Sequence, residues 1–149
     1  MELEKEIQQS KFKNEYQKLI LNVLYTSGWL SSLQTQYFRP YKISVQQYNI
    51  LRILRGQYPN PATVNLLKDR MLDKMSNASR LVEKLRLKGL IERHQCEKDR
   101  RAVDVVITDK GLNLLKELDS VVERWDELFS HVTIEEAKET NRILDKMRG

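Results

Sequence analysis

The stretch from Asp73 to Gly111, DKMSNASRLVEKLRLKGLIERHQCEKDRRAVDVVITDKG, decides the fold and carries most of the functional signal. It reads as a basic helix that ends at a glycine, followed by two short runs with β-branched residues around a charged tip. Gly89 is placed to end the helix in a left-handed conformation, and Leu90 can pack on Leu85, as in a Schellman motif. The stretch therefore predicts a helix followed by a β-hairpin.

Positive charge is concentrated in the same part of the chain. Residues 68–101 contain eleven Lys and Arg against six Asp and Glu, a net charge of +5. The whole chain has 26 basic and 21 acidic residues, which leaves fifteen of each sign elsewhere. A basic helix beside a basic hairpin tip favours a polyanionic partner, and double-stranded DNA is the leading candidate.

Capping residues mark the helix starts upstream of this stretch. Ser44, with a glutamine three residues later, forms a capping box that predicts a helix from residue 45 to about residue 57. Thr63 can cap a short helix, and the Asp and Ser of residues 73–76 are candidate caps for the basic helix. Three helices followed by a hairpin predict a winged helix-turn-helix lobe at residues 43–108.

The flanking segments predict long amphipathic helices. Residues 12–37 carry apolar side chains at steps of three or four, and this helix should end near Arg39, before a proline. A similar stripe follows the predicted N-cap Thr108. Thr133, with a glutamate three residues later, begins a further amphipathic helix.

These stripes exceed what one small core can bury, so a homodimer is expected. We predict a single domain over residues 1–149, in which residues 1–42 and 109–149 supply dimerisation helices. The expected fold class is mainly α with a small β-hairpin wing, that is, a winged helix-turn-helix flanked by long N- and C-terminal dimerisation helices.

The run DRRAVDVVITDKG resembles the wing signature of the MarR family of bacterial transcriptional regulators. That signature has an Asp, any residue and an Arg before a strand that ends in Leu-Thr or Ile-Thr, with a Gly three residues later. Asp99, Arg101, Thr108 and Gly111 match it, and residues 79–93 are similar to the family's recognition helix and the start of its wing. The resemblance extends over essentially the whole chain. It implies a homodimer that binds a pseudo-palindromic operator, usually as a repressor, often released by a small phenolic or aromatic ligand or by oxidation.

Five polar residues at the start and along one face of the basic helix are candidates to face a major groove. Asn and Arg side chains can pair bidentately with adenine and guanine edges, and Ser hydroxyls suit bases or phosphates. A solvated helix face with its caps is the plainer interpretation of the same residues. The candidates are Ser76, Asn77, Ser79, Arg80 and Lys84.

The hairpin tip offers a second set of contacts. Arg101 stands two residues after Asp99, whose carboxylate can orient the guanidinium for a narrow minor groove. Lys98 and Arg100 can then reach flanking phosphates. The alternative is a solvated tip whose ion pair contributes little.

Aromatic residues gather in sequence around the end of the first long helix and the start of the next one. The effector crevice of similar proteins lies between the dimer helices and the DNA-binding lobe, so these residues could line a pocket for a small aromatic ligand. An aromatic core is the simpler explanation. The pocket candidates are Tyr25, Trp29, Tyr37, Tyr41 and Tyr48.

Other chemistries find no support in the sequence. The glycines are too far apart for a nucleotide-binding loop, and no G-x-S-x-G is present, so no enzyme activity is expected. His94 and Cys96 lack further ligands for a metal, and no cofactor is expected. The thiol-switched branch of the MarR family has its cysteine in the first helix, where this chain has none, so Cys96 is interpreted as an ordinary exposed thiol.

The charged N-terminus and the absence of a long apolar run predict no signal peptide, no membrane span and a cytoplasmic location. Two other function classes stay open: a winged-helix module for protein interaction, and a basic module that binds structured RNA.

Overall fold

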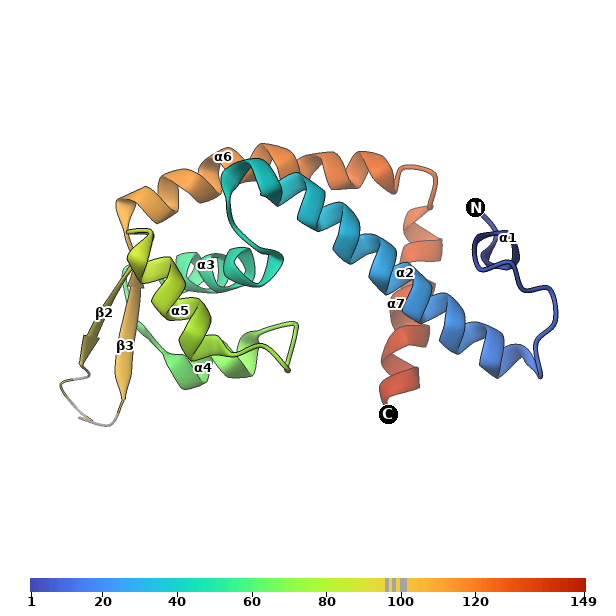
Figure 1. The fold of residues 1–149 in the computed structure, drawn as a ribbon, viewed down its shortest axis with the longest axis horizontal. Helices are drawn as coiled ribbons and strands as arrows, with labels where there is room; N and C mark the ends of the chain where they lie inside the picture. The colour runs from blue at the N-terminus through green and yellow to red at the C-terminus, as the bar shows by residue number, and fades with distance from the viewer. Residues whose placement is uncertain (96, 98, 100–101) are drawn as a thin grey trace.

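The computed structural model describes residues 1–95, 97, 99 and 102–149. Two long helices, α2 (Glu15–Phe38) and α6 (Asp109–Leu128), form the top of an arch (Figure 1). One foot of the arch is a lobe of short helices and strands. The other foot is formed by the first part of α2 together with α1 (Leu3–Glu6) and α7 (Ile134–Arg148).

The lobe follows the predicted order of elements. Its capping residues are confirmed: the Ser44 side chain accepts from the N–H of Gln47, whose side chain in turn accepts from the N–H of Ser44. The Thr63 hydroxyl accepts from the N–H of Leu66. In chain order the lobe contains η1 (Arg39–Tyr41), α3 (Val45–Gln57), β1 (Ala62–Thr63), α4 (Val64–Arg70), α5 (Ala78–Leu87), β2 (Ile91–Gln95) and β3 (Val103–Ile107).

The predicted hairpin belongs to an antiparallel sheet of three strands in the order β1-β3-β2. Within the hairpin, the register runs from Ile91 opposite Ile107 to Gln95 opposite Val103. The third strand, β1, was not predicted, because a strand of two residues that includes the helix cap Thr63 is too short for a periodicity signal.

Gly89 ends the recognition helix candidate α5 as the sequence predicted. Its φ is 71°, and the N–H of Leu90 donates to the carbonyl of Leu85 at 3.1 Å. The N–H of Gly89 donates to the carbonyl of Arg86 at 2.9 Å, which completes a Schellman motif. Leu85 and Leu90 are both buried, so the chain turns from α5 into β2 in a fixed direction.

A second glycine fixes the junction between the sheet and α6. A Cβ atom added at Gly111 would lie 2.3 Å from the carbonyl oxygen of Leu90 and 2.7 Å from Cγ1 of Ile107. Thr108 caps α6 by accepting from the N–H of Gly111 at 3.1 Å, and its hydroxyl donates to the carbonyl of Gly89 at 2.8 Å. The ends of α5 and β3 and the start of α6 are therefore held in one close-packed junction.

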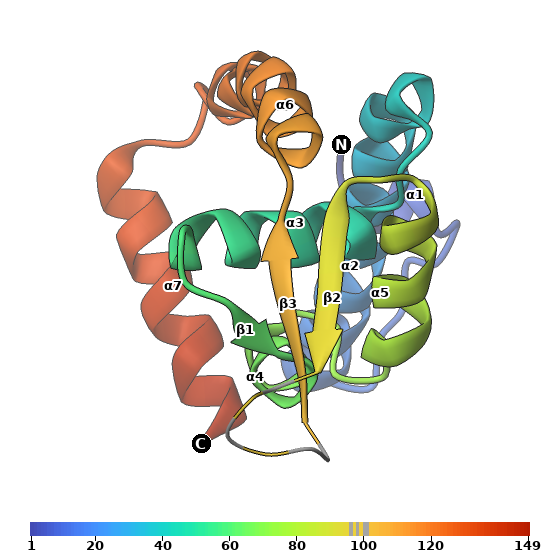
Figure 2. The ribbon, with the colours of Figure 1, turned by 90° about the vertical axis from the view of Figure 1, so that its left-hand side faces the viewer.

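The buried core lies in the lobe, between α3, α5 and the sheet, and α6 seals it with Leu115 and Leu118. In contrast, α7 has no buried residue, and several large apolar side chains of α2 are exposed. In Figure 2, α7 lies at the left of the lobe, and α2 lies behind the lobe at the right. Among the residues that the structure describes, no helix is long and apolar enough to cross a membrane.

Candidate nucleic-acid interface

The amphipathic pattern of α5 turns its basic residues outward. Ala78, Val82 and Leu85 are buried against the lobe core. Arg80 and Lys84 are exposed on the far side of the same helix, four residues apart and hence on one face. Neither forms an ion pair with a carboxylate in the part of the chain that the structure describes. Both charges are therefore available to an anionic ligand.

The start of α5 corrects one sequence expectation. Its N-cap is Asn77, whose Oδ1 accepts from the N–H of Arg80 at 3.0 Å. Asp73 instead closes a turn of its own, accepting from the Ser76 hydroxyl at 2.8 Å and from the N–H of Met75 at 3.0 Å. These two bonds hold the pKa of the Asp73 carboxyl below its usual range.

The capping pattern limits what the proposed base-contacting residues can still offer. Asn77 uses its oxygen as the cap and keeps its amide donors, while Ser76 donates its proton to Asp73 and keeps acceptor lone pairs. Ser79 is exposed on the first turn of the helix. The five candidates thus lie together on one end and one face of α5.

The hairpin strands β2 and β3 lie side by side at one edge of the lobe (Figure 1). Three wing candidates, Lys98, Arg100 and Arg101, lie outside the described residues, as does Cys96. Asp99 is described, and its carbonyl accepts from the N–H of Ala102 at 2.9 Å.

Sequence reasoning missed a charged cluster between α5 and β2. Glu83 binds the guanidinium of Arg86 through both oxygens, at 3.0 Å and 2.7 Å, and one oxygen also lies 3.3 Å from a guanidinium nitrogen of Arg93. Arg86, with a smaller contribution from Arg93, lowers the pKa of the Glu83 carboxyl. The spacing of Glu83 and Arg86 is a detectable helix pair, but the contribution of Arg93 depends on the tertiary structure.

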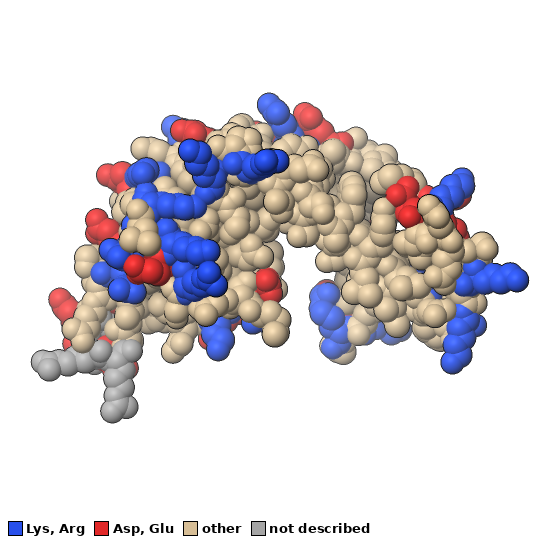
Figure 3. Space-filling model, in the orientation of Figure 1, with Lys and Arg blue, Asp and Glu red and all other residues tan. Residues whose placement is uncertain are grey.

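Lysine side chains also stabilise the C-terminal end of α5. The Lys88 ammonium donates to the carbonyl of Lys42 at 2.5 Å and to Gln47 Oε1 at 3.2 Å, and its burial lowers its pKa. Lys110 donates to the carbonyl of Lys88 at 2.8 Å. Cations near a helix C-terminus are favourable. Figure 3 shows Lys and Arg side chains gathered over this part of the lobe.

The aromatic residues predicted as a pocket contact other side chains. Tyr48 is buried and stacks on Phe38 with ring centroids 4.5 Å apart, and the Tyr25 hydroxyl donates to Glu6 at 2.7 Å. Trp29 contacts Phe129 edge to face. The plainer interpretation, aromatic packing, fits these contacts. The five residues predicted as a pocket, Tyr25, Trp29, Tyr37, Tyr41 and Tyr48, are all outside the lining of the cavity described next.

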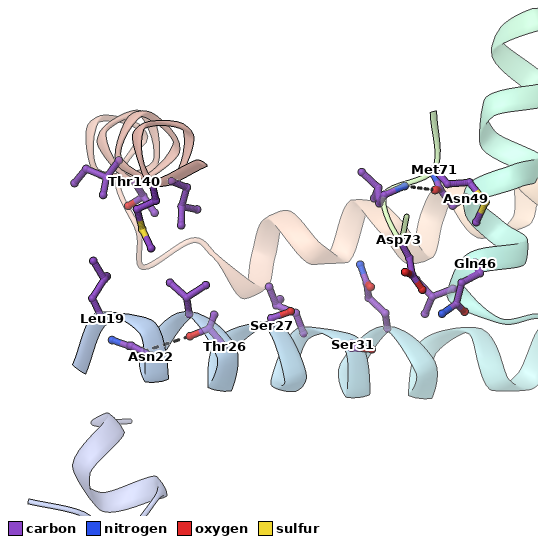
Figure 4. Close-up of a pocket in the computed structure, with 18 residues that line it drawn as sticks. Leu19, Asn22, Thr26, Ser27, Ser31, Gln46, Asn49, Met71, Asp73 and Thr140 are labelled. Carbon is purple, nitrogen blue, oxygen red and sulfur yellow. Dashed lines mark hydrogen bonds between the residues drawn. The ribbon is translucent and has the colours of Figure 1, made fainter. Parts of the chain in front are cut away.

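A cavity of about 860 Å³ lies along α2. Side chains of α2, including Asn22 and Ser27, run along it, α7 lies at one end, and Asn49 and Asp73 lie at the other (Figure 4). The Asn49 oxygen accepts from the N–H of Leu72 at 3.0 Å. Its amide nitrogen is buried and has no hydrogen-bond partner among the described residues.

Metal chemistry has no site in the described part of the chain. No group of three or more His, Cys, Asp or Glu side chains there is arranged to hold an ion.

Known proteins resemble this chain most clearly over the lobe. The model of the MarR family matches residues 43–103. The chain is 37% identical over 71 residues to the HTH-type transcriptional regulator BilQ of Clostridium symbiosum, a match that covers 47% of this chain and 49% of that protein. The matched segment thus spans about half the length of this curated relative.

Solved structures agree over nearly the whole chain. A MarR transcription factor from Planctomyces limnophilus is 29% identical, covers 91% of this chain and 98% of its own, and gives a TM-score of 0.69. A MarR variant from E. coli, crystallised with operator DNA, is 23% identical and gives a TM-score of 0.77; the match covers 93% of this chain and 99% of that one. MepR from S. aureus, in its complex with DNA, is 22% identical and gives a TM-score of 0.75; the match covers 92% of this chain and 97% of that one. The last two similarities establish the fold alone.

Proposed function

The MarR family model matches the winged helix at residues 43–103, and from that match we propose that this chain is a MarR-family protein and a homodimeric transcriptional regulator that binds double-stranded DNA. The single observation that carries the proposal is the exposed basic face of α5 beside a β-hairpin, where Arg80 and Lys84 form no ion pair with any carboxylate that the structure describes. A helix of this kind suits the major groove and a hairpin tip suits the adjacent minor groove. Solved neighbours with DNA bound support the same mode.

Roles follow from the positions of the side chains. Arg80 and Asn77 read base edges, and Ser76, Ser79 and Lys84 contact bases or phosphates. At the wing, Arg101 enters the minor groove with Asp99 as its orienting partner, and Lys98 and Arg100 contact phosphates. The wing roles rest on the sequence signature.

The surface of the single chain supports the homodimer. It exposes 11271 Å², whereas a compact monomer of 17.7 kDa would expose about 7,900 Å². For two chains the excess is roughly 6,700 Å², which lies at the upper end of the total area that obligate dimers bury. The exposed apolar side chains of α2 and α7, such as Leu24 and Ile134, supply that interface, so residues 1–42 and 109–149 act as dimerisation helices. A two-fold dimer dictates an operator with two half-sites about one helical turn, or ~34 Å, apart.

We propose repression, released by a small effector, as the mode of regulation, which is what the family resemblance implies. The specific support for an effector is Asn49, whose buried amide nitrogen lies beside the cavity along α2 and has no acceptor among the described residues. A ligand with an apolar body and a carbonyl or carboxylate oxygen would supply that acceptor. Asn49→Asp keeps an oxygen for the N–H of Leu72 and removes the amide donor, so it should weaken release by such a ligand.

Competition binding tests the proposed function. Duplex fragments from the gene's own promoter region, random duplexes and structured RNA compete for the full-length protein in a gel-shift assay. A DNA-binding regulator prefers its own duplex. Preference for RNA, or no nucleic-acid binding, would favour the alternatives of an RNA-binding or protein-interaction module.

A further inference from the structure

The charged cluster of Glu83, Arg86 and Arg93 joins two elements of the lobe. Glu83 and Arg86 lie on α5 and Arg93 lies in β2, and Figures 1 and 2 both show these two elements side by side. The three side chains are about half-exposed, with 38%, 42% and 44% of their side-chain surface accessible. The cluster carries a net charge of +1 and is open to solvent.

The hydrogen bonds within the cluster leave donors unused. Arg86 engages Glu83 through Nε and one terminal nitrogen, and Arg93 engages it through one terminal nitrogen only. Each guanidinium carries five N–H donors, so both retain donors that Glu83 does not occupy. Because one carboxylate already holds both guanidiniums in place, the two arginines would lose less side-chain conformational entropy on binding an anion.

The position of the cluster matches a known feature of duplex DNA. A helix in the major groove and a hairpin in the neighbouring minor groove straddle the sugar-phosphate backbone that separates the two grooves. In that docking mode the backbone would run past the seam between α5 and β2. The seam is where Glu83, Arg86 and Arg93 meet.

We propose that Arg86 and Arg93 form a binding site for a phosphate of the DNA backbone, and that Glu83 is the positioning residue that orients both guanidiniums. The inference rests on the proposed DNA-binding function and adds residues that the recognition face and the wing signature do not include. Because the contact is to phosphate, it contributes affinity without sequence preference.

The chain contains a matched control for this cluster. Arg142 and Glu139 on α7 make the same bidentate pair three residues apart, at 2.8 Å and 2.6 Å. The pair is more exposed, and α7 lies on the other foot of the arch from α5. Arg142→Gln thus removes an equivalent charge and ion pair away from the proposed DNA surface.

The test is duplex affinity of the full-length protein across a salt series, on a promoter-region duplex and on a random duplex. For Arg86→Gln and Arg93→Gln we expect the slope of log affinity against log salt to fall by about 0.9 per protomer for each lost phosphate contact. Affinity should fall by a similar factor, roughly three- to tenfold near 0.1 M salt, on both duplexes. Arg93→Lys should retain most of the slope, and Arg142→Gln should match the wild type.

Glu83→Gln tests the positioning role by the sign of its effect. If Glu83 were only a negative charge near DNA, its removal would tighten binding. As a positioning residue, its removal weakens binding, and Arg93→Gln then costs less in the Glu83→Gln background than in the wild type. Melting temperatures check that each variant is folded.

The outcomes separate the site from the function. If the wild type binds duplex DNA and both Arg variants keep its salt slope, the phosphate site is wrong and the proposed function stands. Tighter binding by Glu83→Gln overturns the positioning role. If the wild type binds no duplex, both proposals fail.

Discussion

One guanidinium nitrogen of Arg55, on α3, donates to both carboxylate oxygens of Asp119, on α6, at 2.9 Å each. The pair joins the lobe to the long helix that leaves it, across 64 positions of sequence. Their side chains remain 35% and 45% exposed, so solvent screens much of the attraction.

Breaking this pair should have a small effect on stability. We expect Asp119→Asn to lower the free energy of unfolding by at most about 1 kcal/mol, and less at high salt. A double-mutant cycle with Arg55→Gln measures the pairwise part. A coupling that does not weaken between low and high salt would contradict a screened, half-exposed ion pair.

Gly111 should be intolerant of any side chain. Gly111→Ala places a Cβ against the Leu90 carbonyl and Ile107, and we expect a loss of roughly 1–3 kcal/mol in the free energy of unfolding. Gly56→Ala is the control, because nothing lies within 4 Å of its added Cβ and it sits in α3. The free energy of unfolding of Gly56→Ala should rise by about 0.4–1 kcal/mol. Chemical denaturation measures the free energy of unfolding of both variants. Equal changes in Gly111→Ala and Gly56→Ala would refute the close-packed junction.

Arg80 and Arg101 should have separable effects on DNA binding. If Arg80 reads a base edge, Arg80→Ala should lose about 1–3 kcal/mol per half-site on the operator and much less on random DNA. If Arg101 enters a minor groove, Arg101→Ala should weaken both, most strongly at A·T-rich flanks. Operator and random-duplex affinities measured for each variant make the comparison. Unchanged affinity of Arg101→Ala on every duplex would remove the wing from the proposal.

The dimer should depend on the apolar side of α7. Ile143 is 39% exposed in the single chain and lines the cavity opposite α2. We expect Ile143→Glu to yield a monomer at micromolar concentration with its helical content retained, because α7 has no buried residue in the single chain. Arg142→Gln, the neighbouring control, should stay dimeric. Light scattering that finds a folded wild-type monomer would disprove the dimer.

Acid should loosen the start of α7. Bonds from the N–H and hydroxyl of Thr133 lower the pKa of the Glu136 carboxyl below its ordinary value near 4.5. Because the pKa of Glu136 is lower in the folded state, its ionised carboxylate stabilises the fold. This stabilisation is complete above the pKa of the unfolded state and is lost as the pH falls through the pKa of the folded state. The stability difference between wild type and Glu136→Gln should therefore shrink below about pH 4.5. Denaturation curves at several pH values measure it, and a constant difference would argue against this cap.

Local signals in the sequence were sufficient for the helix starts and stops. Ser44, Thr63, Thr108 and Thr133 each cap a helix through a bond to a residue three positions later, so the relevant partners lie within a short window of sequence. Gly89 ends α5 for the same local reason. The outward face of α5 also followed from sequence, because helical periodicity alone separates its buried and exposed sides.

Contacts between distant segments required the tertiary structure. The strand β1 exists only because β3 pairs with it, and Arg93 joins Glu83 only because the Gly89 turn folds β2 back along α5. Asn49 became a candidate ligand contact only once α2, α3 and α7 were placed around one cavity. The sequence by itself determined local backbone geometry, because that geometry depends on residues that are close neighbours along the chain. Only the packing of the tertiary structure decided which side chains of separate elements meet, since the hydrophobic effect is not directional and does not specify particular partners.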